Sequence, residues 1–317
     1  MRKNPGFLAC LLSCVLGMTL SIGFPASVAY AEPSATAANF LLVPVGGRAN
    51  ALGGAYAALA DDAYAMHFNP GALGVAPQQL AFAHNEYFLD LNQEYLSYVH
   101  PLDVGTIGVS VNYFDLGNFS RTFINNTADP NNSNSVSTGA GFDASNYAIS
   151  LGYGRPMLMD GLNLGVTVKY VREEIAEYDD ATVAADLGAY WREKGNPLSV
   201  GFAVTNLGDK LRLKAKDDDL PITFRLGAAY RMMAERFLVT ADVQKTVKDD
   251  DIYVHAGGEY WVANMLALRV GYDHTNEIGS GLTAGAGFKM DRFTLDYAWA
   301  DYDELDMSHR ISLQYNF

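Results

Sequence analysis

The chain has very little cysteine. Its two cysteines, Cys10 and Cys14, both lie in the first 31 residues. These residues have the three parts of a secretory signal peptide: a short basic start, an apolar run from Phe7 to Ile22, and an Ala-Tyr-Ala cleavage site. The exported chain, from residue 32 onward, is therefore predicted to contain no cysteine. Without disulfide bonds, a packed core or a closed sheet must stabilise it.

Basic residues are also scarce. The sequence has 22 Lys and Arg against 36 Asp and Glu, and its net charge of −14 becomes −16 without Arg2 and Lys3 of the signal peptide. A nucleic-acid partner is not expected, because phosphate binding requires a basic surface. A membrane-spanning helix is not expected either, because no stretch of about 18 apolar residues beyond the signal peptide is free of charge.

The motifs of common active sites and metal centres are missing. The sequence contains no C-x-x-C, no H-E-x-x-H and no phosphate-binding glycine loop. Two histidines near acidic loops are the only candidates for a hydrolase, and a histidine without a placed nucleophile is usually structural. The six histidines follow no ligand spacing, so we predict no metal, no cofactor and no enzyme; they are His67, His84, His100, His255, His274 and His309.

Glycine and aromatic residues are abundant, with 30 Gly, 19 Tyr and 16 Phe. This mixture is typical of barrels built from many strands, short turns and aromatic girdles. From residue 79 onward apolar residues recur at every second position, as in Phe293, Leu295, Tyr297 and Trp299, which is the signal of a strand. We predict fourteen strands, at residues 79–88, 93–101, 104–116, 145–156, 161–176, 182–193, 197–207, 222–232, 236–246, 251–261, 265–274, 281–289, 293–301 and 308–317.

The linkers between these strands alternate in length. Tight linkers follow the even-numbered strands, whereas long polar linkers such as 117–144 and 208–221 follow several odd-numbered ones. This alternation is typical of a transmembrane antiparallel barrel in outer-membrane lipid, here over residues 79–317. The last strand ends in Phe317, which resembles the signal read by the outer-membrane assembly machinery. With the C-terminus on the short-turn, periplasmic side, an even strand count predicts that the N-terminus returns to the periplasm too.

Residues 32–78 do not share the alternation. We interpret them as a leader followed by a hatch, or plug, because their many small residues suit a segment packed inside a narrow lumen. Asp61 and Asp62 are expected to cap a short helix that ends at Asn69-Pro70-Gly71. The predicted hatch residues are Arg48, Gly53, Gly54, Asp61, Asp62, Asn69 and Pro70.

The stretch from Phe40 to Leu73, FLLVPVGGRANALGGAYAALADDAYAMHFNPGAL, resembles the N-terminal signature of the PorV/PorQ family, part of the FadL-like superfamily of outer-membrane proteins. The shared features are the G-x-R-A-x-x-L-G-G-A-Y segment, the A-D-D-A pair and the Asn-Pro turn. The chain has Asn-Pro-Gly-Ala-Leu at residues 69–73, where the family usually has Asn-Pro-Ala-Gly-Leu. The resemblance implies a fourteen-stranded monomeric barrel with a hatch.

The resemblance leaves the function open between two roles. FadL-like members transport hydrophobic compounds, whereas PorV-type members serve a protein secretion system, and a structural or adhesive surface barrel is a third alternative. Transport predicts a kinked wall strand, for which Gly105 and Gly108 are the candidates. The acidic loops are candidates for divalent-cation binding, with carboxylates at Asp301, Asp303, Glu304 and Asp306.

Overall fold

The computed structural model describes residues 36–59, 62–87, 91–124, 135–213, 216–276, 278–303 and 307–317. The chain divides into two units, Met1–Pro33 and Ser34–Phe317. The predicted signal peptide lies outside the described residues. Among the helices that the structure describes, none is long and apolar enough to cross a membrane.

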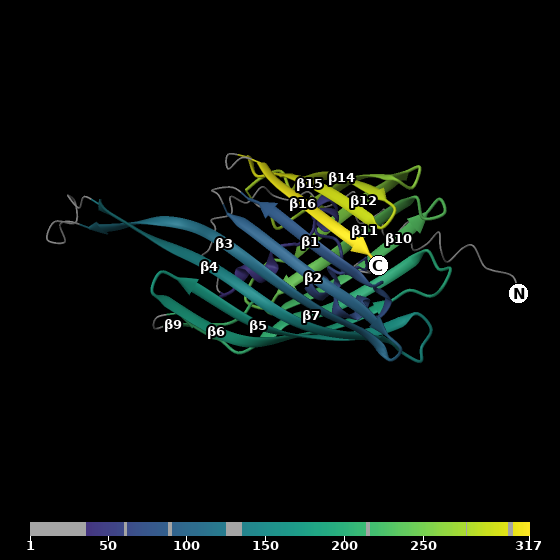
Figure 1. Ribbon diagram of the computed structural model, residues 1–317, viewed down its shortest axis with the longest axis horizontal. Helices are drawn as coiled ribbons and strands as arrows, with labels where there is room; N and C mark the ends of the chain where they lie inside the picture. Colours follow the sequence, from purple (N-terminus) through teal and green to yellow (C-terminus); the bar gives the residue numbers. More distant parts are fainter. Residues whose placement is uncertain are drawn as a thin grey trace, which may run out of the picture. The chain divides into compact units, whose positions relative to one another are not determined.

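Fourteen of the described strands form a closed antiparallel barrel (Figure 1), as the sequence predicted. Each strand pairs with its neighbours along the chain, and β1 pairs with β16 to close the sheet. The strands are β1 (Gln79–Glu86), β2 (Asn92–Leu102), β3 (Gly105–Ile124), β4 (Ser135–Pro156), β5 (Leu162–Ile175), β6 (Tyr178–Trp191), β7 (Leu198–Gly208), β10 (Thr223–Met232), β11 (Phe237–Thr246), β12 (Tyr253–Val262), β13 (Leu266–Asp273), β14 (Leu282–Met290), β15 (Phe293–Asp301) and β16 (Met307–Asn316).

The outer surface of the barrel is apolar. Along β10 the inward side chains of Thr223 and Arg225 are buried, while the outward side chains of Phe224 and Leu226 are 44% and 54% exposed. The same alternation places large apolar side chains on the outside of the other strands. A continuous exposed apolar band of this kind is stable in lipid and not in water, and it therefore indicates a membrane-spanning barrel.

This band provides a matched test by charge insertion. We expect Leu151→Arg, on the outer face of β4, to lower the free energy of unfolding by about 2–4 kcal/mol in lipid vesicles. Leu158→Arg, in the fully exposed β4–β5 turn, should cost about 0–1 kcal/mol, because its charge stays in water. Denaturant unfolding of the two variants measures both values. Equal costs would mean that Leu151 does not face lipid.

Two regions predicted as loops contain strands. Residues 117–144 were predicted as a loop, but β3 continues to Ile124 and β4 begins at Ser135, so the hairpin projects beyond the neighbouring strands (Figure 1). Asn118 Nδ2 donates to Asp143 Oδ1 at 2.7 Å and the rings of Phe119 and Phe142 lie 5.5 Å apart, which holds the extension together. The predicted loop 208–221 contains a small hairpin, β8 (Leu211–Leu213) with β9 (Lys216–Asp218).

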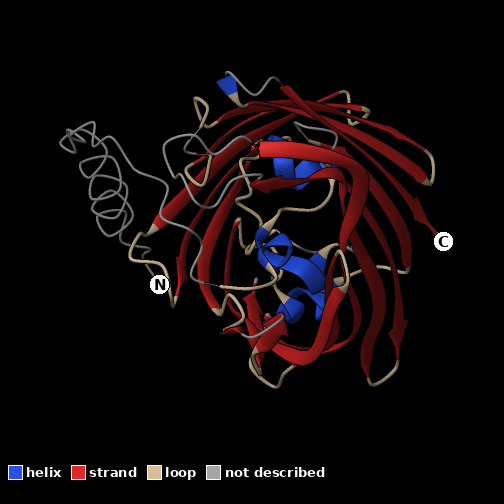
Figure 2. Ribbon diagram, turned by 90° about the vertical axis from the view of Figure 1, so that its left-hand side faces the viewer, coloured by secondary structure: helices blue, strands red, loops and turns tan. Residues whose placement is uncertain are grey.

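The N-terminal segment, residues 36–78, lies within the ring of strands (Figure 2). It contains four short helices, the 3-10 helices η1 (Asn39–Leu42) and η2 (Pro70–Val75) and the α-helices α2 (Gly47–Ala51) and α3 (Ala65–Phe68). Helix α2 was not predicted. Such short helices are not stable alone, so contacts with the barrel wall must hold them.

Candidate functional site in the barrel lumen

The N-terminal segment begins at the long-loop end of the barrel. The backbone N–H of Ala37 donates to Asp219 O at 3.0 Å, and Thr36 forms a bridge to the same residue in the β7–β10 connection. A hydrogen bond from Lys248 holds the pKa of Asp219 below its usual range. The predicted return of the N-terminus to the short-turn side therefore holds for the start of β1, where Gln79 pairs with Asn316, but not for residue 36. The chain crosses the lumen between the two.

The segment then follows the inner wall strand by strand. From Gly47 onward, six of its hydrogen bonds meet β16, β14, β12, β11, β7 and β6 in that order, against the strand order. Other bonds join Ala38 to Glu173 of β5 and Ala63 to Gln79 of β1. Every one of these strands contributes at least one polar contact, so the segment is fixed around much of the circumference. The bonds join Gly47 to Ser312, Ala51 to Thr283, Gly53 to His255, Ala57 to Asp242, Ala58 to Ser199 and Asn69 to Ala189.

A glycine belt lines the wall where the segment packs. A Cβ atom on Gly201 would lie 2.0 Å from Ala57 O, and one on Gly165 would lie 2.0 Å from Pro70 O. Several belt glycines face each other across paired strands, such as Gly257 and Gly271. At Gly165 and Gly201 only a hydrogen atom fits, so the segment's backbone touches the wall directly. At Gly108 and Gly152 the nearest segment atoms belong to the side chains of Met66 and Leu73. The belt consists of Gly108, Gly152, Gly165, Gly188, Gly201, Gly227, Gly257, Gly271 and Gly285.

A buried ionic network ties α2 to the wall. Arg48 makes a bidentate ion pair with Glu259 of β12, with Nε at 2.9 Å and Nη2 at 3.0 Å from the carboxylate oxygens. Glu259 also accepts from Arg269 Nε at 2.7 Å, and Arg269 Nη1 donates to Asp296 at 2.7 Å. A buried charge that loses its partner lowers the stability of the fold, so removal of any one of the four charges affects the others.

A second polar cluster holds the middle of the segment. The Asp242 carboxylate of β11 accepts from the backbone N–H groups of Tyr56 and Ala57 at 2.9 and 2.8 Å. On β12, His255 Nδ1 lies 2.8 Å from the Gly53 carbonyl oxygen and 3.2 Å from Asp273 Oδ1. Arg225 of β10 donates to the carbonyl of Gly54 at 2.9 Å. The predicted hatch residues Gly53 and Gly54 therefore present backbone oxygens to His255 and Arg225 of the wall.

The predicted capping residues have other roles than expected. Helix α3 has no side-chain cap; Asp62 instead accepts from Tyr64 N at 2.9 Å and from the Tyr56 hydroxyl at 2.6 Å. Asp61 lies outside the described residues. Asn69 caps η2 by accepting from Gly71 N at 3.0 Å, and Pro70 is the first residue of that helix. A Cβ on Gly71 would lie 2.7 Å from Ala189, which explains the Gly-Ala order at this turn.

The interior of the segment is a well-packed apolar core. Tyr56, Leu59 and Phe68 are almost completely buried, and the rings of Tyr56 and Phe68 lie 5.0 Å apart. Burial raises the pKa of the Tyr64 hydroxyl, which donates to the backbone oxygen of Phe82 in β1. These large side chains of the segment thus fill the middle of the lumen and are almost completely removed from water.

His67 of α3 is held neutral. Burial, followed by the charges of Lys169 and Arg225, lowers its pKa to about 3. Because 6.5 is the ordinary value, the unfolded chain takes up a proton first as pH falls. Burial of the neutral His67 ring therefore does not lower the free energy of unfolding above about pH 6.5. As pH falls from there toward about pH 3, protonation of the unfolded chain lowers that free energy progressively.

We therefore expect His67→Gln to flatten the decrease in Tm between about pH 6 and pH 4. His309→Gln, on the exposed face of β16, is the matched control and should leave the slope unchanged. Thermal unfolding followed by circular dichroism in detergent measures both slopes. An unchanged slope in the His67→Gln variant would assign the acid sensitivity to other groups.

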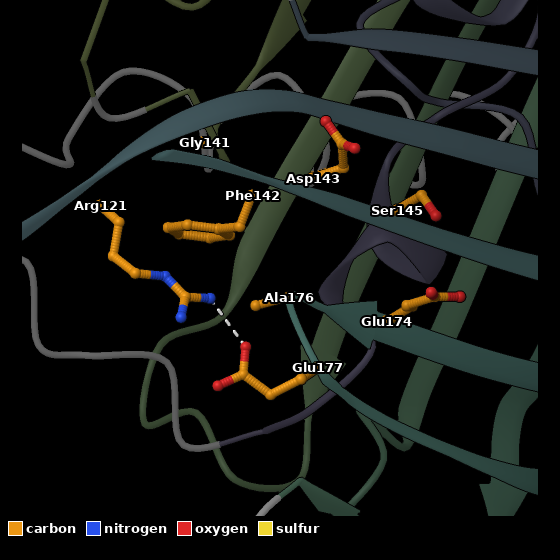
Figure 3. Close-up of a pocket in the computed structure, with 8 residues that line it drawn as sticks. All are labelled: Arg121, Gly141, Phe142, Asp143, Ser145, Glu174, Ala176 and Glu177. Carbon is orange, nitrogen blue, oxygen red and sulfur yellow. Dashed lines mark hydrogen bonds and ion pairs between the residues drawn. The ribbon is translucent and has the colours of Figure 1, made fainter. Parts of the chain in front are cut away.

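Cavities lie at several places along the described part of the barrel. The outer cavity, of about 220 Å³, lies between Leu42–Pro44 of the segment and the wall at the long-loop end. The inner cavity, of about 470 Å³, lies beside the end of η2 and the β2–β3 turn. A third, of about 350 Å³, lies among the outer hairpins (Figure 3), where Arg121 is paired with Glu177 at 2.8 Å and lies beside the Phe142 ring.

Gly105 and Gly108 of β3 are the residues predicted to permit a kink in the wall. The ladders of β3 with β2 and β4 run unbroken past Gly108, and their register shifts fall beyond Asp115. Gly108 faces Met66 as part of the glycine belt, and Gly105 follows the β2–β3 turn. A lateral opening there stays a prediction.

The acidic loop after β15 is described only at its start. Asp301 accepts from the backbone N–H of Asp303 at 3.2 Å, and Glu304 and Asp306 lie outside the described residues. Among the residues that the structure describes, no group of three His, Cys, Asp or Glu is placed to hold a metal ion. Cation binding by this loop stays a prediction.

The fold and lumen define a class: a closed fourteen-stranded antiparallel barrel that carries its own N-terminal segment inside. Residues 26–316 match a family described as an uncharacterised protein family, UPF0164, and the chain belongs to that family. Two UPF0164 proteins of Treponema pallidum (strain Nichols) are similar to it. One is 28% identical over 57% of this chain and 46% of its own length, and the other 24% identical over 83% and 64%. The chain thus spans about half to just under two thirds of these curated relatives.

Solved structures share the fold. The CymD monoaromatic hydrocarbon channel superposes with a TM-score of 0.64 at 14% identity, covering 87% of this chain and 98% of that one. The Ralstonia pickettii toluene transporter TbuX gives 0.64 at 14% identity, covering 86% and 98%. At this level of identity the likeness shows the fold alone.

Proposed function

We propose that the protein is an outer-membrane channel for small hydrophobic compounds and that the N-terminal segment is the hatch that closes it. One observation carries this proposal: the segment fills the lumen of an apolar-faced barrel and leaves a cavity on its outer side. A barrel that only anchored loops would need neither feature. The outer-membrane location rests on the apolar band and on the likeness to transport barrels.

The composition of the outer cavity supports a hydrophobic ligand. It is lined by Leu42, Val43 and Pro44 of the segment and by three tyrosines, together with five polar residues of the wall and its loops. Apolar and aromatic walls with a few polar groups are typical of small-molecule sites. The fold is shared with channels named for monoaromatic hydrocarbons and toluene, which supports compounds of this size.

The hatch is tested by deletion. Removing residues 46–73 should change the barrel in planar bilayers from a closed state to a conducting one, because this stretch provides most of the contacts that fill the lumen. Unchanged conductance in a variant that is folded by circular dichroism would contradict the hatch.

Transport is tested by filling the outer cavity. Val43→Trp should reduce uptake of labelled toluene to the background of a Gram-negative host that lacks its own channels for hydrophobic compounds. Val247→Trp, at an exposed position of the same end of the barrel, should leave uptake unchanged. Uptake that is equal in both variants, or absent in the wild type, would contradict transport through this cavity.

A second candidate function is a role in protein secretion, as the PorV/PorQ resemblance of residues 40–88 suggests. The projecting β3–β4 hairpin favours it, because its exposed Phe119 and Arg121 would offer a surface for a protein partner. An exported protein that copurifies from the native membrane, and is lost when residues 119–142 are replaced by a short turn, would support this role.

A further inference from the structure

The outer cavity has acidic walls. Among its lining residues, Asp249 and Asp273 carry carboxylates, and none of the lining residues that the structure describes is basic. Asp273 of β13 is 8% exposed, and Asp249 follows β11 and is partly buried. Resting on the proposed function, we propose that this cavity selects small aromatic compounds with a positively charged amine over those with a carboxylate.

The two carboxylates are held in place by neighbouring donors. Asp249 accepts from the Tyr253 hydroxyl at 2.7 Å and from the backbone N–H of Asp251 at 2.9 Å. Asp273 accepts from Thr275 N at 3.0 Å and from its hydroxyl at 2.6 Å. These bonds orient the carboxylates before a ligand arrives, and a preorganised charge in a poorly solvated site acts strongly on a ligand charge.

Several basic side chains lie nearby without lining the cavity. His255 Nδ1 lies 3.2 Å from Asp273 Oδ1, and Arg225 donates to Gln244. Arg310 is 2% exposed, lies 4.8 Å from the centre of the Tyr87 ring and donates to the Tyr302 hydroxyl at 2.9 Å. Lys245 donates to the backbone oxygen of Asp249 at 2.5 Å. Because the lining carboxylates are the charges that a ligand would contact, they decide the sign of the local interaction.

The aromatic lining also favours a cation. Tyr87, Tyr253 and Tyr302 all line the same small space, and aromatic rings attract ammonium groups. The entrance adds to this preference, because Asp249, Asp250 and Asp251 form an acidic run in the loop beside it. A carboxylate ligand would be repelled by this negatively charged loop. In the cavity it would lose its hydration beside two carboxylates of the same charge, which would weaken its binding.

Three ligands that share one ring and differ in charge test the inference: protonated benzylamine, benzyl alcohol and benzoate. We expect calorimetry at pH 7, with the protein in lipid nanodiscs and empty nanodiscs subtracted, to give benzylamine about tenfold tighter binding than benzyl alcohol. Benzoate should bind at least about tenfold more weakly than the alcohol. Equal affinities, or benzoate as the tightest ligand, would overturn the charge selection and leave the proposed channel standing.

A matched pair of variants assigns the effect to the cavity. Asp249→Asn should reduce the preference for benzylamine over benzyl alcohol to about threefold or less, with affinity for the alcohol retained as evidence of folding. Asp250→Asn removes the same charge from an exposed neighbour outside the cavity lining, and should keep the tenfold preference. Equal losses in both would overturn the assignment to the cavity. Binding of none of the three ligands would contradict the proposed function itself.

Discussion

Replacing Gly201 by alanine is expected to unseat the N-terminal segment and to open the barrel to ions. The added Cβ would lie 2.0 Å from the carbonyl oxygen of Ala57, which is backbone and has no rotamer to change. Strand β7 is paired with β6 and β10, so the wall has little freedom to move away. Overpacking usually costs about 1–3 kcal/mol, and a backbone clash of this size lies at or beyond the upper end.

Conductance in planar bilayers measures this effect, and the melting temperature shows whether the barrel survives. Gly258→Ala is the matched control, because the nearest atom to a Cβ added there would be Leu238 O, at an ordinary contact distance of 3.8 Å. The control should stay closed and keep its melting temperature. A closed Gly201→Ala barrel of unchanged stability would show that the segment moves easily away from the wall.

Glu259→Ala is expected to be among the most destabilising single substitutions in the lumen. It would leave Arg48 and Arg269 without their shared carboxylate, and loss of one partner from a buried pair costs about 3–5 kcal/mol. Arg48→Ala should cost less, about 1–2 kcal/mol, because Glu259 keeps Arg269 as a partner and Arg48 is itself 20% exposed.

Denaturant unfolding in lipid vesicles compares these variants. Glu177→Ala removes an exposed carboxylate paired with Arg121 and should cost no more than about 1 kcal/mol. Combining Arg48→Ala with Glu259→Ala should cost less than the sum of the two, since both act on one network. Additive losses would show that Arg48 and Glu259 are not coupled.

The barrel strands could be predicted from the sequence to within a few residues at most positions. Alternation of apolar and polar residues is a local signal, and a strand needs it wherever one side faces lipid and the other faces a polar lumen. The prediction failed where the strands extend beyond the lipid. Residues 117–124 and 135–144 lie beyond the apolar band, so they form strands through cross-strand contacts such as Phe119 with Phe142.

The lumen could be predicted only in outline. The motif residues suggested a hatch, but the glycine belt depends on which inward positions of different strands lie at one level, and this requires the register. The sequence did contain a signal for the belt, because glycines recur at inward positions of successive strands. We interpreted Gly105 and Gly108 as a possible kink and did not use this recurrence. The position of residue 36 at the long-loop end could not be predicted, because its partner Asp219 is 183 positions further along the chain than Thr36.

The reverse path of the segment has a consequence for biogenesis. Gly47 binds Ser312, which is 265 positions away, so residues made early must wait for strands made last. Contacts of such large sequence separation form late, because the loop between them must close first. The segment cannot reach its final place before β12 to β16 are folded, and the seam between β1 and β16 must close around it. The barrel and the segment that fills its lumen must therefore assemble together.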